Sequence, residues 1–353
     1  MSDLRHSFRV AFHAVGGLLL CAVFAVSFPA AAADAVADFY RDRTVTIYVG
    51  FPPGGQYDIY ARLLAKHLRA RLPGNPNVIV QNMTGAASLT AANHVINVAP
   101  QDGTAIAATS AALPFQPLLD VKSAKFDAVR TNWLPVPTSE INLVSVWHTV
   151  PLNAFLDARN RETVLGTSGI TSAPAFYARI FNDVFKTKFK MVHGYSGSSE
   201  VFLAIERGEV EGHASAPLST IKGTYGAWLK DKKIKLLLQY GTKPSPELPD
   251  VPFARDLAQS EDDKLLLDMA MAPTFLGRPY LMGPGVPAER LSAMRKAIMD
   301  TWTDPAVAAE AKRADLDINP LDGEAVQAIV DRTYKAPQPL IDRLRTLYSG
   351  EQK

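Results

Sequence analysis

The residues best suited to bind a ligand form the turn Pro52–Gly55, which reads Pro-Pro-Gly-Gly. An alternating β-branched run, Val45–Val49, predicts a strand before the turn, and apolar residues on one face predict a helix from Asp58 to Leu72. A turn between a strand and a helix N-terminus presents unpaired backbone N–H groups and the positive end of a helix dipole. Because glycines lack side chains, an anion such as a carboxylate can approach these N–H groups closely.

The pattern alone slightly favours an ordinary structural turn over a ligand site. It is not a nucleotide motif, because neither G-x-G-x-x-G nor a Gly-Lys-Ser/Thr sequence is present. Asp58 has two compatible roles: an ion pair with Arg62 four residues later, or a brace that holds the turn open. Both roles remain open from the sequence.

Two segments resemble the nucleophile elbow G-x-S-x-G without matching it. Ser198 and Ile170 stand where the last glycine belongs in the segments around Ser196 and Ser168. A serine hydrolase that uses Ser168 or Ser196 is therefore the alternative function, with His213 available later in the chain. Nothing around His213 marks it as a base, so these segments are more simply read as sources of hydroxyl and N–H groups.

Metal and cofactor chemistry has no support in the sequence. The histidines after the N-terminal region occur singly, without metal-site spacing: His67, His94, His148, His193 and His213. The four tryptophans are also far apart and form no aromatic box: Trp133, Trp147, Trp228 and Trp302. We expect no catalytic residue, no cofactor and no metal site.

The first 33 residues have the features of a cleavable signal peptide. Arg5 and Arg9 precede a short apolar run, and Ala31–Ala33 offers a cleavage site before Asp34. Cys21 is the only cysteine, and the leucines before it do not match a lipoprotein signal. The sequence thus predicts an exported chain that starts near Asp34 without disulfide or lipid, which fits the bacterial periplasm.

Length and charge limit the class of partner. Without Asp3, Arg5 and Arg9, the remaining chain carries 35 basic and 34 acidic residues, which provides no basic surface for nucleic acid. Its 320 residues suffice for two domains. We expect a small ligand, no nucleic-acid partner and a monomer.

Strands and helices alternate along the chain, which predicts parallel sheets and an α/β fold. Tyr280–Met282 is predicted to be a strand that returns to the first domain. The predicted domains are residues 34–137 plus 262–353 and residues 138–261, joined by two crossings. Such crossings create a cleft between domains, where small ligands commonly bind.

Several motifs in order resemble the Bug family, the extracytoplasmic receptors of tripartite tricarboxylate transporters. Residues 52–62 match P-P-G-G-x-x-D-x-x-A-R at every fixed position, and residues 82–86 resemble the N-x-x-G-A turn. Further matches are residues 102–104, 166–169, 194–197 with 207–210, 248–252 and 283–287. The resemblance covers nearly the whole chain after the predicted signal peptide.

This resemblance implies a type II periplasmic-binding-protein fold with two α/β domains and a ligand cleft between them. It also implies a receptor that delivers a small organic acid (a di- or tricarboxylate or an aromatic carboxylate) to an integral membrane permease. The implied ligand loops are Phe51–Asp58, with Phe51, Pro53, Gly54, Gly55, Gln56, Tyr57 and Asp58, and Thr167–Ser172, with Thr167, Ser168, Gly169, Ile170, Thr171 and Ser172. Thr84, Ser88, Tyr195, Ser196 and Gly197 are the implied walls.

The chain departs from the family pattern at three places. Gln101 replaces the usual proline before Asp-Gly, and Ala87-Ser88 replaces the residues usual at the second and third small positions of the N-x-x-G-A turn. Tyr57 occupies a position where Thr or Ser is common. A tyrosine there can stack on a ligand or crowd it, so the size and class of the ligand stay open.

Overall fold

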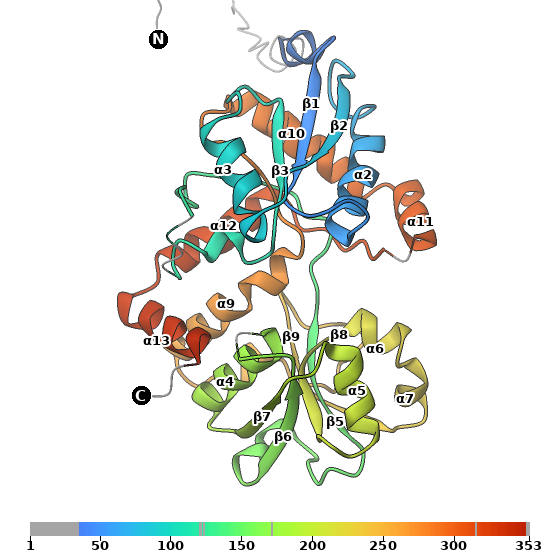
Figure 1. Ribbon diagram of the computed structural model, residues 1–353, viewed down its shortest axis with the longest axis vertical. Helices are drawn as coiled ribbons and strands as arrows, with labels where there is room; N and C mark the ends of the chain where they lie inside the picture. Colours follow the sequence, from blue (N-terminus) through green and yellow to red (C-terminus); the bar gives the residue numbers. More distant parts are fainter. Residues whose placement is uncertain (1–34, 120–121, 123, 171, 315, 351–353) are drawn as a thin grey trace, which may run out of the picture.

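The computed structural model describes residues 35–119, 122, 124–170, 172–314 and 316–350. The predicted signal peptide at residues 1–33, with Cys21, lies outside these residues and stays a prediction. The strands of the described residues form two five-stranded sheets, one in each half of the molecule in Figure 1.

The first sheet has the order β2-β1-β3-β10-β4. Its strands are β1 (Thr44–Val49), β2 (Asn77–Asn82), β3 (Ala105–Ala108), β4 (Asn132–Leu134) and β10 (Tyr280–Met282). β1 pairs in parallel with β2 and β3, so that Ile47 lies opposite Val80 and Ile106. β10 pairs antiparallel with β3 and β4, which confirms the predicted return of Tyr280–Met282 and makes the sheet mixed.

The second sheet repeats this arrangement with the order β7-β6-β8-β5-β9. Its strands are β5 (Asn142–Trp147), β6 (Glu162–Thr167), β7 (Lys188–His193), β8 (Gly212–Pro217) and β9 (Ile234–Tyr240). β6 is parallel to β7 and β8, whereas β5 is antiparallel to β8 and β9.

Helices surround each sheet (Figure 1). Around the first sheet lie α2 (Gln56–Leu68), α3 (Leu89–Asn97), α10 (Ala288–Trp302), α11 (Pro305–Arg313) and α12 (Gly323–Tyr334). Around the second lie α4 (Ala173–Phe185), α5 (Ser198–Glu206), α6 (Leu218–Gly223), α7 (Gly226–Lys230) and α8 (Ala254–Leu257). Short 3-10 helices occur at Ala86–Ser88, Leu113–Phe115 and Phe155–Arg159.

β1 and α2 illustrate how the sequence pattern produces the core. Val45, Ile47 and Val49 are fully buried, and Leu64 and Leu68 of α2 are buried as well. Complete burial of one such side chain stabilises the fold by about 1.5–3 kcal/mol. The period-2 and helical patterns thus select the strand and the helix that flank the Pro52–Gly55 turn.

One helix, α9, bridges the helices of the first sheet and those of the second, and a second helix, α13, packs beside it. α9 (Glu261–Leu276) contacts α12 of the first sheet and α4 of the second, and α13 (Gln338–Ser349) contacts α9 and α4. Figure 1 shows both helices between the two halves, on the left. The domain boundaries at residues 137/138 and 261/262 stay a prediction, with α9 beginning at the second of them.

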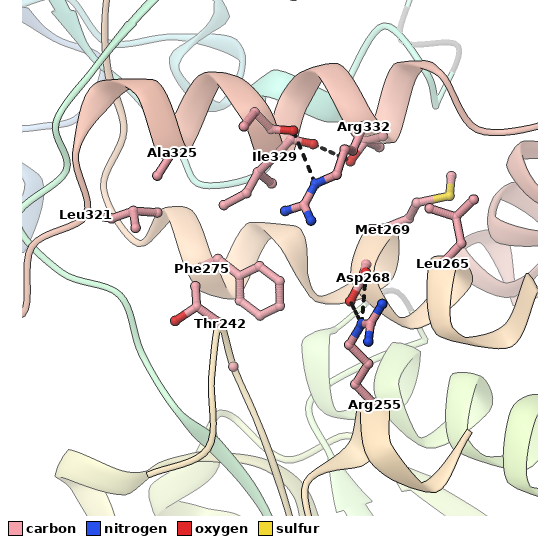
Figure 2. A pocket seen from close by; sticks show the side chains of 13 residues that line it. Thr242, Arg255, Leu265, Asp268, Met269, Phe275, Leu321, Ala325, Ile329 and Arg332 are labelled. Atoms are coloured by element: carbon pink, nitrogen blue, oxygen red, sulfur yellow. Dashed lines mark hydrogen bonds and ion pairs between the residues drawn. The ribbon is translucent and has the colours of Figure 1, made fainter. Parts of the chain in front are cut away.

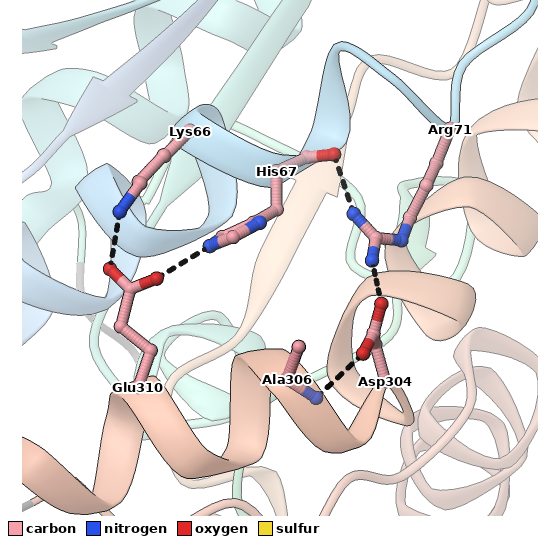
Figure 3. A network of polar contacts seen from close by, with 6 residues as sticks. All are labelled: Lys66, His67, Arg71, Asp304, Ala306 and Glu310. Carbon is pink, nitrogen blue, oxygen red and sulfur yellow. Dashed lines mark hydrogen bonds and ion pairs between the residues drawn. The ribbon is translucent and has the colours of Figure 1, made fainter.

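A polar network ties the C-terminal end of α2 to α11 (Figure 3). Glu310 accepts a hydrogen bond from Lys66 Nζ at 2.8 Å and lies 2.9 Å from His67 Nε2. Arg71 pairs with Asp304, which caps α11. Such partly exposed pairs each contribute little stability, but together they fix the orientation of α2 and of the turn at its other end.

Candidate functional site

A cavity of about 360 Å³ lies between the two sheets. Both halves of the chain contribute to its walls: Tyr57, Ala111, Glu140, Asn142, Ala173, Pro174, Tyr177, Ser198, Ser215, Pro217, Pro273, Thr274, Gly277 and Arg278. The volume suits a small ligand, and several polar groups converge on it, as is typical of binding sites.

The turn before α2 is held by Asp58, whose side chain is only 2% exposed. Its Oδ2 accepts hydrogen bonds from the Gly54 N–H and from Arg62 Nε, both at 2.8 Å. Its Oδ1 accepts from Arg62 Nη2 at 2.9 Å and from Asn82 Nδ2 at 2.8 Å. Both predicted roles of Asp58, ion pair and brace, are therefore present.

These contacts set the charge of Asp58. Burial works to raise its pKa, but hydrogen bonds from Arg62, Gly54 and Asn82 outweigh burial and hold the pKa below its ordinary value. The Gly54 N–H is already used by Asp58, so the remainder of the turn has to supply any N–H groups for an anion. Gly54 has φ +81°, whereas Gly55 has φ −75°, which any residue adopts.

Two side chains at the start of α2, directly after this turn, reach toward the cavity. Tyr57 lines it and stacks on Phe51, with ring centroids 4.0 Å apart. Gln56 Oε1 accepts a hydrogen bond from Arg278 Nη2. The first residue of α2 is thus bonded to Arg278, the cation in the cavity wall.

Arg278, which follows α9, is the cation of the cavity. Its guanidinium lies 4.4 Å from the ring centroid of Tyr60 and donates to Thr138 Oγ1 at 3.1 Å. Its buried Nε has no hydrogen-bond partner among the described residues. Nη1 and Nη2 each carry two N–H groups, and the bonds to Thr138 and Gln56 use one of each, so the guanidinium has further donors for an anion in the cavity.

Glu140 is the only carboxylate among the residues that line the cavity. Burial raises its pKa, while the charge of Arg278 acts in the opposite direction. Its backbone N–H donates to the Thr274 carbonyl at 3.3 Å, which joins the approach to β5 to α9.

The second sheet contributes the N-termini of α4 and α5. Ala173 and Pro174 of α4 and Ser198 of α5 line the cavity. Neither helix has a side-chain cap. Before α4, the Ser172 hydroxyl donates instead to the Gly169 carbonyl at 2.7 Å, and the residue before α5 is Gly197. The free N–H groups of these first turns are available to an anion.

His213 fixes the direction of the hydrogen bond to Ser198. Its Nδ1 accepts from the Ser215 N–H at 3.0 Å, so the proton of the neutral ring is on Nε2. Nε2 then donates to Ser198 Oγ at 3.2 Å, and the Ser198 hydroxyl proton remains free for a ligand. Burial lowers the pKa of His213 to about 4, which keeps the ring neutral near pH 7.

This geometry disfavours the hydrolase alternative. His213 has no free nitrogen to accept a serine proton, and it contacts Ser198 rather than Ser168 or Ser196. Ser196 donates to Glu200 at 2.7 Å, and Ser168 is exposed. Among the described residues, neither Ser168 nor Ser196 therefore has the histidine partner that activates a serine nucleophile.

The structure brings together only some of the residues predicted from the sequence. Of these residues, only Tyr57 lines the cavity, while Gln56, Ser172 and Gly197 lie next to lining residues. The others are in the turn (Phe51, Pro53, Gly54, Gly55, Asp58), at the exposed Thr84, and in segments beside the cavity (Ser168, Gly169, Tyr195, Ser196). Thr171 lies outside the described residues.

Three predicted residues have clear structural contacts instead. Ser88 is fully buried and accepts from the Ser110 N–H at 2.9 Å. Thr167 is fully buried, with Oγ1 2.6 Å from His193 Nδ1. Ile170 lies beside Gly350, where an added Cβ would be 2.7 Å from Ile170 Cγ2. All three stay predictions as ligand residues.

The polar lining residues outside the predicted set are Glu140, Asn142, Tyr177, Ser198, Ser215, Thr274 and Arg278. They come from segments far apart in the chain, so no local motif unites them. Ser198 was noticed only as the residue that spoils an elbow motif. No sequence motif marks the half-buried Arg278, which lies between Gly277 and Pro279 after α9.

A second cavity, of about 500 Å³, lies between α9 and α12 (Figure 2). Its walls are mainly apolar, with Leu265, Met269 and Phe275 on α9. Arg255 pairs with Asp268 at its edge, 3.2 Å apart. Its two arginines are bonded within the chain, Arg255 to Asp268 and Arg332 to the Ala328 carbonyl. The cavity around Arg278 is lined from both sheets and by two helix N-termini, so it is the better candidate for an anion.

In the part of the chain that the structure describes, no three His, Cys, Asp or Glu side chains group closely enough to hold a metal ion. None of the described helices combines the length and apolar character needed to cross a bilayer.

Comparisons with known proteins find relatives in sequence and in structure. No family model matches the chain. It is 27% identical over 253 residues to the UPF0065 protein in the gbd 5′ region of Cupriavidus necator, which covers 68% of this chain and 72% of that protein. It is 38% identical over 81 residues to protein BugT of Bordetella pertussis, which covers 23% of this chain and 24% of that protein.

Solved structures share the fold. A TctC solute-binding protein from Polaromonas, without ligand, has a TM-score of 0.70 at 21% identity and covers 87% of this chain and 98% of its own. The periplasmic binding protein BugD (0.51, 19%, covering 88% and 97%) and R. palustris Rpa4515 with adipate (0.52, 20%, covering 86% and 97%) are also similar. Together with the two mixed sheets, these likenesses confirm the predicted periplasmic-binding-protein fold with two α/β units.

Proposed function

We propose that this chain, which its relatives and structural neighbours support as a receptor of the Bug and TctC family, captures a small organic carboxylate in the cavity between its two sheets. The observation that carries this proposal is Arg278, a cation in the wall of a cavity that the N-termini of α4 and α5 also line. The TctC and BugD structures are those of binding proteins, and Rpa4515 holds adipate, which supports the same class of ligand here.

The energetics favour an acid held from both sheets. Removing a carboxylate from water costs several kcal/mol. One helix N-terminus returns only about 0.3–1 kcal/mol, up to about 2 when partly buried. Arg278, the Ser198 hydroxyl and the first turns of α4 and α5 supply several donors, and a hydrogen bond with a charged group contributes about 1.5–3 kcal/mol.

The proposal includes delivery of the acid to an integral membrane permease, in the periplasm and as a monomer without catalytic activity. Its basis is the relatives' role as binding proteins and the signal-peptide pattern of residues 1–33. Intact mass of the exported protein tests the location. We expect a chain that starts near Asp34, whereas a mass that retains Cys21 with an acyl group would contradict it.

The central experiment compares two arginines in two cavities. Calorimetric titration with small organic acids should give binding that Arg278→Gln weakens at least tenfold, about 1.4 kcal/mol. Arg332→Gln, in the wall of the cavity between α9 and α12, is the matched control and should bind like the parent. A thermal-shift screen finds the acids first, since a ligand at 100 times its Kd adds about 2.7 kcal/mol.

Two results would contradict the proposal. If no organic acid stabilises the folded protein, the cavity is not a carboxylate site. If Arg332→Gln abolishes binding while folded Arg278→Gln binds normally, the acid occupies the other cavity. Circular dichroism of both variants confirms that a loss of binding is not a loss of fold.

A further inference from the structure

The cavity contains an acidic side chain that a receptor for polyanions would not need. Glu140 and Arg278 line the same cavity, yet no ion pair joins them. Among the described residues, the Glu140 carboxylate has no hydrogen-bond or ion-pair partner, although its backbone N–H is bonded to Thr274. Arg278 instead uses Thr138 and Gln56 as acceptors. The cation and the anion are therefore separately available to a ligand.

Each charge attracts a different ligand group. Arg278, with the N-termini of α4 and α5, attracts a carboxylate. Glu140 repels a second carboxylate that comes near it and attracts an ammonium or an amide N–H. Because burial lowers the local dielectric, both effects are stronger in this cavity than at an exposed surface.

We propose that the cavity selects an acid with one carboxylate, bound at Arg278, and an N–H donor at its other end, bound at Glu140. This class includes amino acids and monoamides of diacids, and it excludes di- and tricarboxylates as preferred ligands. The inference rests on the proposed function, since it assigns the ligand class of the same cavity.

Matched probes differ only at the second end. Calorimetric titrations compare a diacid, its monoamide and the corresponding ω-amino acid at three chain lengths: succinate, glutarate and adipate with their counterparts. For the parent protein we expect the monoamide or the amino acid to bind at least tenfold more tightly than the diacid of the same length. Glu140→Gln should reduce this ratio to below threefold, because the amide no longer repels a carboxylate.

Glu289→Gln is the control, since Glu289 is an exposed residue of α10 and should leave every ratio unchanged. The inference is overturned if the parent binds diacids as tightly as their partners, or if Glu140→Gln keeps the parent's ratio. If binding depends on Arg278 but is equally tight for the diacid, the monoamide and the amino acid, the receptor proposal stands and the proposed selection by Glu140 is rejected. No binding by any probe rejects both.

Discussion

Asp58 braces the Pro52–Gly55 turn, which leads into Gln56 and Tyr57 of α2. Replacing Asp58 by Asn should destabilise the protein by about 2 kcal/mol. Asn keeps one acceptor oxygen and places an NH₂ group where the other oxygen was. Whichever oxygen is replaced, two of the four donors lose their acceptor: the Gly54 N–H and Arg62 Nε, or Arg62 Nη2 and Asn82 Nδ2.

The magnitude follows from which donors find water. Arg62 is 53% exposed, so it replaces its lost bond with solvent at little cost. The Gly54 N–H or the Asn82 amide loses a partly buried bond to a charged group, and such a bond contributes about 1.5–3 kcal/mol. A looser turn should also weaken acid binding, because Gln56 no longer holds Arg278 as firmly.

Urea unfolding followed by circular dichroism measures this loss. Asp38→Asn is the matched control, because Asp38 forms an exposed pair with Arg41 and should change stability by less than about 0.5 kcal/mol. The pKa of Asp58 is depressed in the folded state, so its contribution is present above the ordinary pKa and is lost as pH falls through the folded value. Equal unfolding midpoints for Asp58→Asn and Asp38→Asn at neutral pH would refute the brace.

Three further outcomes are expected. Because the pKa of His213 is lowered to about 4, the unfolded chain binds a proton that the folded chain excludes; stability should fall from about pH 6.5 toward pH 4, and His213→Gln should lack this part of the slope in urea titrations. Gly54→Ala should cost about 1 kcal/mol because of its φ of +81°, whereas Gly55→Ala should be nearly neutral; equal unfolding midpoints would contradict this. A saturating acid should reduce the radius of gyration in solution scattering if the two units close on it, and an unchanged radius would reject that hinge.

Local patterns in the sequence were sufficient for most elements. Alternation predicted the strand at Val45–Val49, and Pro and Gly residues marked the turns that separate strands from helices. The predicted helix after the turn begins at Gln56 rather than Asp58 and ends at Leu68 rather than Leu72. Of the two turn glycines, Gly54 holds the left-handed conformation and Gly55 does not, a difference that the Pro-Pro-Gly-Gly pattern does not reveal.

α9 was not predicted, and its burial explains why. α9 contacts four other helices (α4, α8, α12 and α13), and most of its residues from Leu266 to Leu276 are buried, so this part lacks the polar face that makes a helical period visible. A start signal was nevertheless present: Ser260 precedes three acidic residues, and its Oγ accepts from the Asp263 N–H at 3.0 Å. The missed helix ends next to Arg278, so the cation of the cavity was missed with it.

The cavity's chemistry depends on contacts that no local sequence pattern encodes. His213 donates to Ser198 only because the Ser215 N–H occupies its other nitrogen, and this makes the serine a donor toward the cavity. Arg278 lines the cavity just after the end of α9, and its guanidinium donates a hydrogen bond to Gln56 at the start of α2. Under the proposed function, a carboxylate between these groups would accept hydrogen bonds from both halves of the chain, and the same bonds would hold the two units together around it.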